Sequence, residues 1–334
     1  MDATKTLPAS WYTSQNLYSL EQRAVFYKAW YLVGAVPRFP AGEEVEYEFA
    51  QVAISVRHDG NENFEVTRKS DVRFVAGRTS AFVDFVLNHY LTPTGLLFTT
   101  IDSSAPPFEQ WFPPSLLELL SGYNFRRLPH RRSIKYPGKF NWKTMVDGYQ
   151  ECLHCQYTHR SFSVIYPPTF YEVHNHETYS RHIADPQKAN DGLFLFFFPI
   201  CTLNLYGGGM SSFRVCPGEK VGETRMEFDY YFDDGKGGVE GFEDYFNFVR
   251  KVALEDFELC EVAQGNLERG VYSQGVLNQT KESGVLHYQQ LTRKMVVEKF
   301  KEEEAERNVW SPAANGRASG VGHVSGQDDV AVSA

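Results

Sequence analysis

The stretch NWKTMVDGYQECLHCQYTH, residues 141–159, gathers one carboxylate, two thiols and two imidazoles in its last nine residues. On a regular helix Glu151 and His154 share a face, whereas His159 is rotated by about 140° from His154. Both imidazoles can therefore reach one ion only if the helix ends or distorts between them. The spacing predicts a helix end at a metal site.

A third ligand must come from elsewhere in the chain, because two imidazoles and a distant carboxylate form the facial triad that holds Fe(II) with positions open for other ligands. The best candidate is Asp256, in the helical segment 252–260. It lies four residues before Cys260 and three before Leu259, and so can share their inward face. Glu255 and Glu258 are expected to point elsewhere.

The cysteines and histidines of this stretch allow two other interpretations. A structural zinc site could use Cys152, His154, Cys155 and His159, although a helical segment brings these four together poorly. The two histidines could also be packed polar residues. The chain has five cysteines, an odd number, which fits a reducing compartment better than a disulfide framework, so free thiols are expected.

Composition narrows the class of protein. With 334 residues and 42% hydrophobic residues, the chain is long enough for two closely packed domains. The net charge is -9, and the 33 basic residues form no stripe, so neither nucleic acid nor a membrane is expected as a partner. There is no signal-like start, and the longest apolar run, residues 193–201, is far shorter than the ~20 residues of a membrane span. These features predict a cytoplasmic protein.

The pattern of apolar residues predicts an α+β fold. Helical spacing over 17–30 predicts an N-terminal helix, and short β-type runs between 31 and 100 predict a small antiparallel module. Four further runs, at 175–182, 193–205, 211–215 and 223–232, predict one antiparallel sheet. Amphipathic helices are predicted at 240–264, against that sheet, and at 289–307. Residues 311–334 carry almost no bulky side chains and are expected to be a disordered tail.

Taken together, these motifs resemble a known family. Asn-Trp-Lys at 141–143, Glu-x2-His-x4-His at 151–159 and the Glu-Asp pair at 255–256 resemble the catalytic half of Rieske-type non-heme iron oxygenase alpha subunits. The opening, from Leu7-Pro8 to Gly34, is similar to the start of the same subunits. With Tyr206-Gly207-Gly208 included, the set of motifs is most similar to that of the choline monooxygenase group within this family. The resemblance covers about residues 7–305 with one gap.

The resemblance implies two domains: a reduced Rieske-like β domain with its N-terminal helix at 1–135, and an iron-containing catalytic domain at 136–310 in which helices cover an antiparallel sheet. It implies that His154, His159 and Asp256 bind Fe(II), and that Glu151 relays electrons from a neighbouring subunit's [2Fe-2S] cluster. It also implies a homo-oligomer, a trimer by the family resemblance, which receives electrons from a ferredoxin or reductase. The reaction would be the oxidation of choline to betaine aldehyde, the first step of glycine betaine biosynthesis.

The gap concerns the cluster itself. A Rieske [2Fe-2S] centre needs two cysteines on one iron and two histidines on the other. Residues 1–151 contain no cysteine, and only His58, His89 and His130 lie there. The family's cluster loops are missing between about residues 56 and 85, so this chain cannot ligate its own cluster. Either the gene model has skipped coding sequence, or the protein is a natural derivative without a cluster.

An aromatic run offers candidate substrate contacts. Residues 194–198 include four phenylalanines, and Tyr206 follows. Such a run can be sheet core, or part of it can surround a quaternary ammonium through cation–π attraction; the candidates are Phe197, Tyr206 and Tyr166. Another quaternary amine or an aromatic ring is the alternative substrate, and an inactive iron-binding subunit is the alternative to an enzyme.

Overall fold

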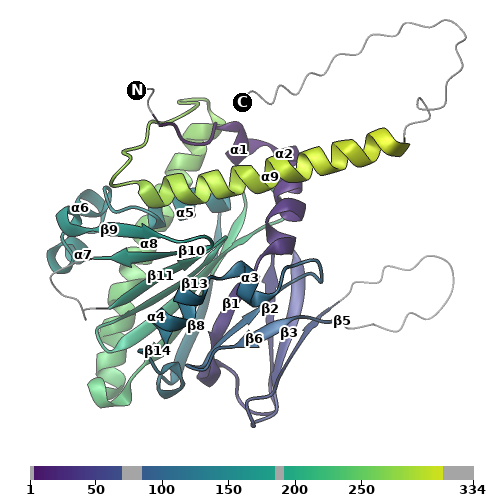
Figure 1. Ribbon diagram of the computed structural model, residues 1–334. Helices are drawn as coiled ribbons and strands as arrows, with labels where there is room; N and C mark the ends of the chain where they lie inside the picture. Colours follow the sequence, from purple (N-terminus) through teal and green to yellow (C-terminus); the bar gives the residue numbers. More distant parts are fainter. Residues whose placement is uncertain (1–3, 70–84, 185–191, 311–334) are drawn as a thin grey trace, which may run out of the picture.

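The computed structural model describes residues 4–69, 85–184 and 192–310 (Figure 1). The predicted tail, 311–334, and part of the sequence gap between 56 and 85 lie outside the described residues. None of the described helices is long and apolar enough to cross a membrane.

The N-terminal part holds short helices and two small antiparallel sheets. One sheet has the strand order β1-β7-β6 and the other β2-β3-β4-β5. The elements are α1 (Ser10–Thr13), α2 (Gln15–Ala24), η1 (Phe26–Lys28), β1 (Tyr31–Ala35), η2 (Val36–Arg38), β2 (Glu44–Phe49), β3 (Val52–His58), β4 (Phe64–Arg68), β5 (Phe85–Val86), β6 (His89–Leu91) and β7 (Leu96–Thr99). The predicted helix at 17–30 therefore ends at Ala24, and its remaining residues lead into β1.

A larger sheet forms the second part, and all its neighbouring strands are antiparallel, in the order β8-β14-β13-β12-β11-β10-β9. Its strands are β8 (His130–Gly138), β9 (Glu172–Asn175), β10 (Tyr179–Ile183), β11 (Leu193–Phe197), β12 (Cys201–Tyr206), β13 (Gly209–Pro217) and β14 (Thr224–Phe232). The sequence pattern predicts this sheet, and the α+β class is confirmed.

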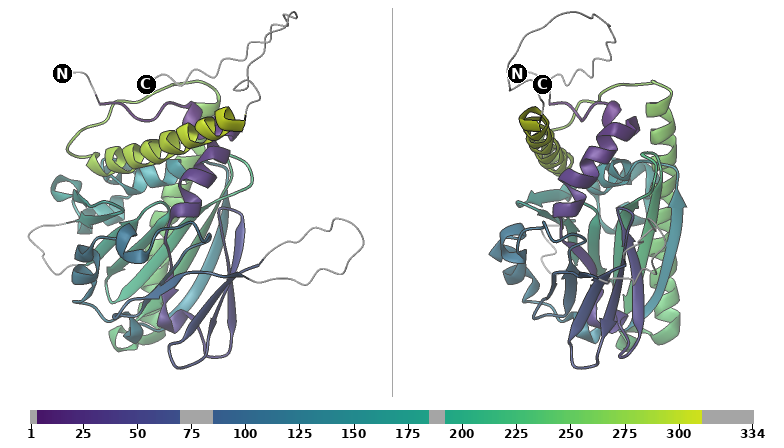
Figure 2. Two further views of the ribbon diagram at one scale, coloured as in Figure 1. Left: turned by 45° about the vertical axis from the view of Figure 1, so that its right-hand side comes forward. Right: turned by 90° about the vertical axis from the view of Figure 1, so that its right-hand side faces the viewer.

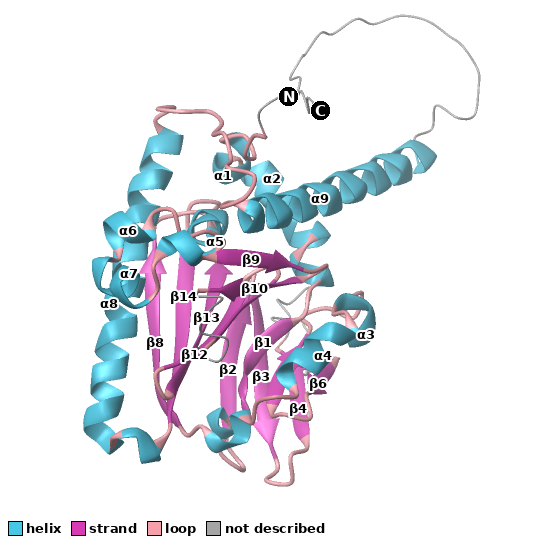
Figure 3. Ribbon diagram, turned by 60° about the vertical axis from the view of Figure 1, so that its left-hand side comes forward, coloured by secondary structure: helices cyan, strands magenta, loops and turns pink. Residues whose placement is uncertain are grey.

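Long helices lie along one face and across one end of this sheet. The long helix α8 (Gly238–Glu268) runs along it, and α9 (Ser283–Trp310) crosses its end beside α2 (Figures 2 and 3). The ion pair between Arg23 Nε and Glu303 Oε1, at 2.7 Å, joins α2 to α9. The shorter helices are α3 (Phe108–Trp111), α4 (Pro114–Leu120), η3 (Phe125–Arg127), α5 (Trp142–Tyr149), α6 (Cys155–Thr158), α7 (Arg160–Ile165), η4 (Pro168–Phe170) and η5 (Asp234–Lys236).

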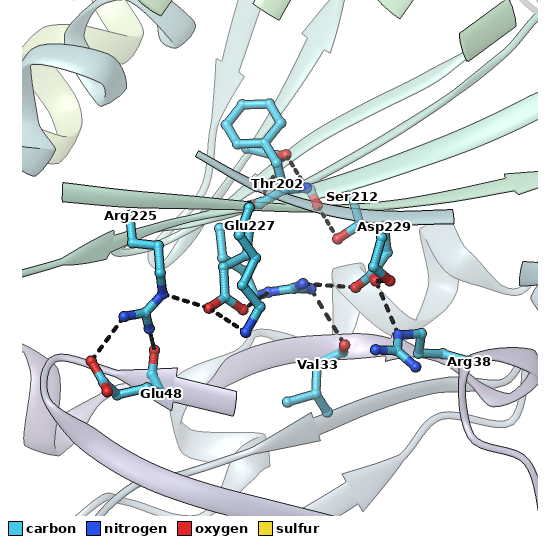
Figure 4. Close-up of polar contacts among 12 residues, drawn as sticks. Val33, Arg38, Glu48, Thr202, Ser212, Arg225, Glu227 and Asp229 are labelled. Carbon is cyan, nitrogen blue, oxygen red and sulfur yellow. Dashed lines mark hydrogen bonds and ion pairs between the residues drawn. The ribbon is translucent and has the colours of Figure 1, made fainter. Parts of the chain in front are cut away.

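Paired charges join the two parts (Figure 4). Arg214 of β13 is buried, and its guanidinium donates to Asp229 Oδ2 at 2.7 Å and to the carbonyl of Val33 at 3.4 Å. Arg38 Nε donates to Asp229 Oδ1 at 3.0 Å. Because side chains alternate along a strand, the neighbouring Phe213 faces the other side of the sheet. One face of the sheet therefore carries the N-terminal part, and the other face is left for α8 and a cavity.

Candidate metal centre

The Asn-Trp-Lys motif anchors helix α5 rather than contributing to the cavity. The Asn141 side chain caps the helix by accepting from Lys143 N at 3.1 Å. Trp142 Nε1 donates to Glu21 Oε2 at 3.0 Å, and Lys143 Nζ donates to Glu21 Oε1 at 2.7 Å. Both Lys143 and Glu21 are fully buried; burial lowers the pKa of Lys143, and the Glu21 carboxylate opposes that shift. The motif therefore fixes α5 against the N-terminal helix α2.

The chain after α5 brings the two histidines to the ends of one short helix. Helix α5 ends at Tyr149, and α6 begins at Cys155. His154 is the residue before α6, and His159 is the residue after it. Helix α6 ends at Thr158, so a helix end lies between the two imidazoles, as their spacing requires.

Three side chains converge at this point. Asp256 Oδ1, from α8, lies 2.8 Å from Nε2 of His159 and 3.3 Å from Nε2 of His154. The two Nε2 atoms are 3.2 Å apart. The potential ligand atoms of His154, His159 and Asp256 all lie within 4.8 Å of one another, a spacing that one metal ion can bridge.

A second carboxylate lies behind each imidazole. Glu151 contacts His154 Nδ1, and Glu255 Oε2 lies 2.9 Å from His159 Nδ1. The expectation that Glu255 points away is therefore wrong: its longer side chain reaches back to the ring from the residue before Asp256. Glu258 is exposed as expected, but so is Leu259, which leaves Cys260 as the buried residue of that turn.

The carboxylates determine the charge of the imidazoles. Burial opposes protonation of His154, but Asp256 and Glu151 outweigh it and raise its pKa to about 10. The pKa of His159 is raised in the same way, against burial, by Asp256 and Glu255. Burial would raise the pKa of Asp256, but the two histidines lower it. A bound cation would displace these protons, because metal-ligating histidines must be deprotonated.

The donor set fits Fe(II) and does not fit a Rieske cluster. Two imidazoles and one carboxylate that approach one point match the facial triad, and each imidazole has the carboxylate partner that usually orients such ligands. The free cysteines, Cys201, Cys216 and Cys260, are buried in β12, β13 and α8 respectively. The N-terminal part has none, so the described residues supply no thiolate pair there.

Cys152 and Cys155 form a disulfide. The expectation of free thiols is therefore wrong for these two cysteines and holds for the other three. The turn before α6 brings the Cα atoms of this pair to 5.0 Å, within the range that a disulfide spans. The pairing occupies both thiols of the candidate zinc site, which removes them as thiolate ligands.

A cavity, partly open to solvent, adjoins the three converging side chains. Besides His154, His159 and Asp256, its wall contains seven aromatic residues, and Glu151, Asn204 and Ser211 are further polar residues. The aromatic members are Tyr149, Phe162, Tyr171, Phe194, Tyr206, Phe213 and Phe228.

The three candidate substrate residues have different positions. Tyr206 lines the cavity. Tyr166 lies behind it, with its ring centroid 5.6 Å from Phe194 and 6.2 Å from Tyr206. Phe197 is fully buried and packs against Phe98 and Phe112 on the other face of the sheet. Its proposed place in the cavity is therefore wrong, because alternation along β11 directs Phe194 into the cavity and Phe197 away from it.

Sequence reasoning missed several cavity residues. Asn204 lies two residues before Tyr206 on β12, and so shares its face; this alternation was a usable signal. Tyr149 lies within residues 141–159, at the last position of α5. Tyr171 has no comparable signal, because it follows a 3-10 turn.

The sequence matches the family described as ring hydroxylating alpha subunit (catalytic domain) over residues 125–191 and 174–298, together more than half of the chain. The chain therefore belongs to the ring-hydroxylating alpha-subunit family, and its resemblance to Rieske-type oxygenases is confirmed. It is an enzyme of that family.

Two relatives of known name align with most of this chain. The carnitine monooxygenase oxygenase subunit of Escherichia coli K12 is 24% identical over 86% of this chain and 92% of its own length. The chloroplastic choline monooxygenase of Arabidopsis thaliana is 23% identical over 82% of this chain and 79% of its own.

Solved structures share the fold. The quaternary ammonium Rieske monooxygenase CntA in complex with L-carnitine superposes with a TM-score of 0.72 at 18% identity, covering 88% of this chain and 96% of that one. Naphthalene 1,2-dioxygenase from Rhodococcus sp. gives a TM-score of 0.64 at 14% identity, covering 88% and 95%.

Proposed function

We propose that this chain is the iron-containing subunit of a monooxygenase that oxidises a small quaternary ammonium alcohol, with choline as substrate and betaine aldehyde as product. Such a reaction is the first step toward glycine betaine. One observation carries the proposal: seven aromatic rings line the cavity beside His154, His159 and Asp256. Aromatic faces attract a quaternary ammonium, by about 2 kcal/mol when the contact is desolvated.

The charge of the cavity favours choline over carnitine. Carnitine carries a carboxylate in addition to its trimethylammonium group, and a buried carboxylate requires a cationic or hydrogen-bonding partner. No lysine or arginine is among the described residues that line the cavity, whereas Glu151 and Asp256 are. A cation without a carboxylate is therefore the better match.

Each part of the site has a role in this proposal. His154, His159 and Asp256 hold Fe(II), which supplies reductive O2 activation when bound. Glu151 and Glu255 orient the two imidazoles. The aromatic wall holds the substrate and excludes water.

Electrons for the reaction come from outside the chain. Inserting one oxygen atom from O2 while reducing the other to water consumes two electrons, which a ferredoxin or reductase supplies. Glu151, whose carboxylate accepts from the backbone N–H of the exposed Leu153, is the proposed relay from a neighbouring subunit's cluster. A homotrimer is the assembly that we propose from the family resemblance.

Calorimetry on the iron-loaded protein tests the substrate. Choline is expected to bind at least tenfold more tightly than 3,3-dimethyl-1-butanol, its neutral isostere, and more tightly than carnitine. Tighter binding of carnitine would assign a different quaternary amine, and tighter binding of the neutral isostere or of naphthalene would indicate a ring hydroxylase. Binding of iron with no affinity for any of these compounds would favour an inactive iron-binding subunit.

A further inference from the structure

The buried His182 and the partly buried Tyr171 form a polar pair at the edge of the cavity. Tyr171 lies just before β9 and lines the cavity, and His182 is on the adjacent strand β10. Tyr171 Oη lies 2.7 Å from His182 Nδ1. The imidazole is only 2% exposed and is also in ring contact with Tyr149, with a centroid distance of 5.0 Å. Neither residue contacts the three candidate metal ligands through a described hydrogen bond.

The surroundings of His182 determine which nitrogen carries the proton. Burial lowers the pKa of His182 to about 3, so the ring is neutral. Nε2 of His182 is buried and has no hydrogen-bond partner among the described residues. A buried N–H without a partner is costly and rare, whereas an unpaired acceptor is tolerated more often. The favoured tautomer therefore places the proton on Nδ1, which donates to Tyr171 Oη.

This tautomer has a consequence for Tyr171. Since its oxygen accepts from His182, its own O–H is directed to a different partner. Burial and the nearby carboxylates of Glu151 and Asp256 raise the pKa of Tyr171, so the phenol remains a donor. Tyr171 belongs to the wall of the cavity, in which seven of the lining side chains are aromatic.

We propose that Tyr171 donates a hydrogen bond to the hydroxyl oxygen of the substrate, and that His182 is the positioning residue that directs this proton into the cavity. The inference rests on the proposed function and adds that the substrate must carry a hydroxyl group. The aromatic rings select the quaternary ammonium, and the Tyr171–His182 pair selects an alcohol on the same molecule.

Two ligands distinguish recognition of the cation from recognition of the hydroxyl group. Choline and ethyltrimethylammonium carry the same cation, but only choline carries a hydroxyl. Calorimetry should show choline binding to the unmodified protein about 3- to 10-fold more tightly, the range of one net hydrogen bond. In Tyr171→Phe this preference should disappear while ethyltrimethylammonium affinity stays within twofold. Tyr157→Phe, a change at a residue 75% exposed and outside the cavity, should leave both affinities unchanged.

Two substitutions at His182 test its positioning role. His182→Asn can place an N–H near the position of Nδ1 and should keep the preference for choline, whereas His182→Leu should lose it. If His182→Leu fails to fold, Tyr171→Phe and His182→Asn still decide the question. Equal affinities for the two ligands in the unmodified protein, or an unchanged preference in Tyr171→Phe, would overturn this inference alone. Failure of both ligands to bind the unmodified protein would overturn the proposed function and this inference with it.

Discussion

Glu255 Oε2 lies 2.9 Å from Nδ1 of His159, while Nε2 of the same ring faces Asp256 at 2.8 Å. The imidazole is thus held between two carboxylates that are adjacent in sequence on α8. His154 has the corresponding arrangement, with Glu151 at Nδ1 and Asp256 near Nε2. Asp256 is therefore common to both rings, and a different glutamate fixes the orientation of each.

Removing the glutamate behind His159 should weaken metal binding without abolishing it. In Glu255→Ala the ring loses the partner that fixes its orientation, and the affinity for Fe(II) is expected to fall about 10- to 100-fold. Competition with a chelator of known affinity measures this change. Glu258→Gln, on the exposed side of the same helix, is the matched control and should retain full affinity. An unchanged affinity in Glu255→Ala would contradict the orienting role.

Breaking the buried ion pair between Lys143 and Glu21 should destabilise the folded chain. Lys143→Met leaves the fully buried Glu21 without its cation, and is expected to lower the free energy of unfolding by about 3–5 kcal/mol. The double variant Lys143→Met with Glu21→Gln keeps an acceptor for Trp142 and removes the unpaired charge, so it should recover more than half of the loss. Urea unfolding followed by tryptophan fluorescence measures both.

The matched control for that experiment is the exposed pair of Lys220 with Glu223, at 3.0 Å. Lys220→Met should leave the stability nearly unchanged, because exposed ion pairs contribute little. If the double variant were as unstable as Lys143→Met, the loss would come from packing rather than from an unpaired charge.

Asp147 should make stability depend on pH. Its carboxylate accepts from Tyr12 Oη at 2.7 Å and from Gln289 Nε2 at 2.7 Å. Burial nevertheless raises its pKa to about 6. A raised carboxyl pKa gives stability that is fully present below the ordinary value near 4 and is lost as the pH rises through 6. Between pH 4 and pH 7 the free energy of unfolding should therefore fall by about 1–3 kcal/mol more than in Asp147→Asn.

Urea unfolding at a series of pH values measures this difference. Asp244→Asn, at an exposed aspartate on α8, should show the same pH dependence as the unmodified protein. Parallel curves for the unmodified protein and Asp147→Asn would show that the carboxyl group titrates near its ordinary value in the folded chain.

Local patterns in the sequence predict much of this structure. The antiparallel sheet, helix α8 and the helix end between His154 and His159 all follow from spacing within one segment. The partner of Lys143 does not, because Glu21 is about 120 residues away and nothing in either segment indicates the pairing. The same limit applies to Tyr171, whose place at the cavity depends on how β9 packs beside β10.

Two errors of detail have physical causes. Phe197 lies in an aromatic run, and hydrophobicity alone does not indicate which members of a fully buried strand face the cavity. Helical rotation directs Glu255 away from the site, but rotation alone ignores the reach of a long side chain. Both errors concern the direction of a side chain, whereas the position of its element was predicted.

The source of electrons decides whether this chain turns over by itself. Each monooxygenation consumes two electrons, and an iron site alone has no store of them. The chain has five cysteines, of which two form a disulfide and three are buried in β12, β13 and α8. We therefore expect about one iron per purified chain, no acid-labile sulfide and no Rieske signal by electron paramagnetic resonance. A value near two sulfides per chain would contradict this.

With NAD(P)H and a reductase, the unaided chain should give only trace oxidation of choline. Activity should return when the chain assembles with a cluster-bearing homologue whose own iron ligands have been substituted, because turnover then depends on His154, His159 and Asp256 of this chain. His154→Ala in the same mixed assembly is the control and should abolish the restored activity. Steady turnover by the unaided chain would require a path for electrons that bypasses any [2Fe-2S] cluster, since no residue set in the described chain can hold one.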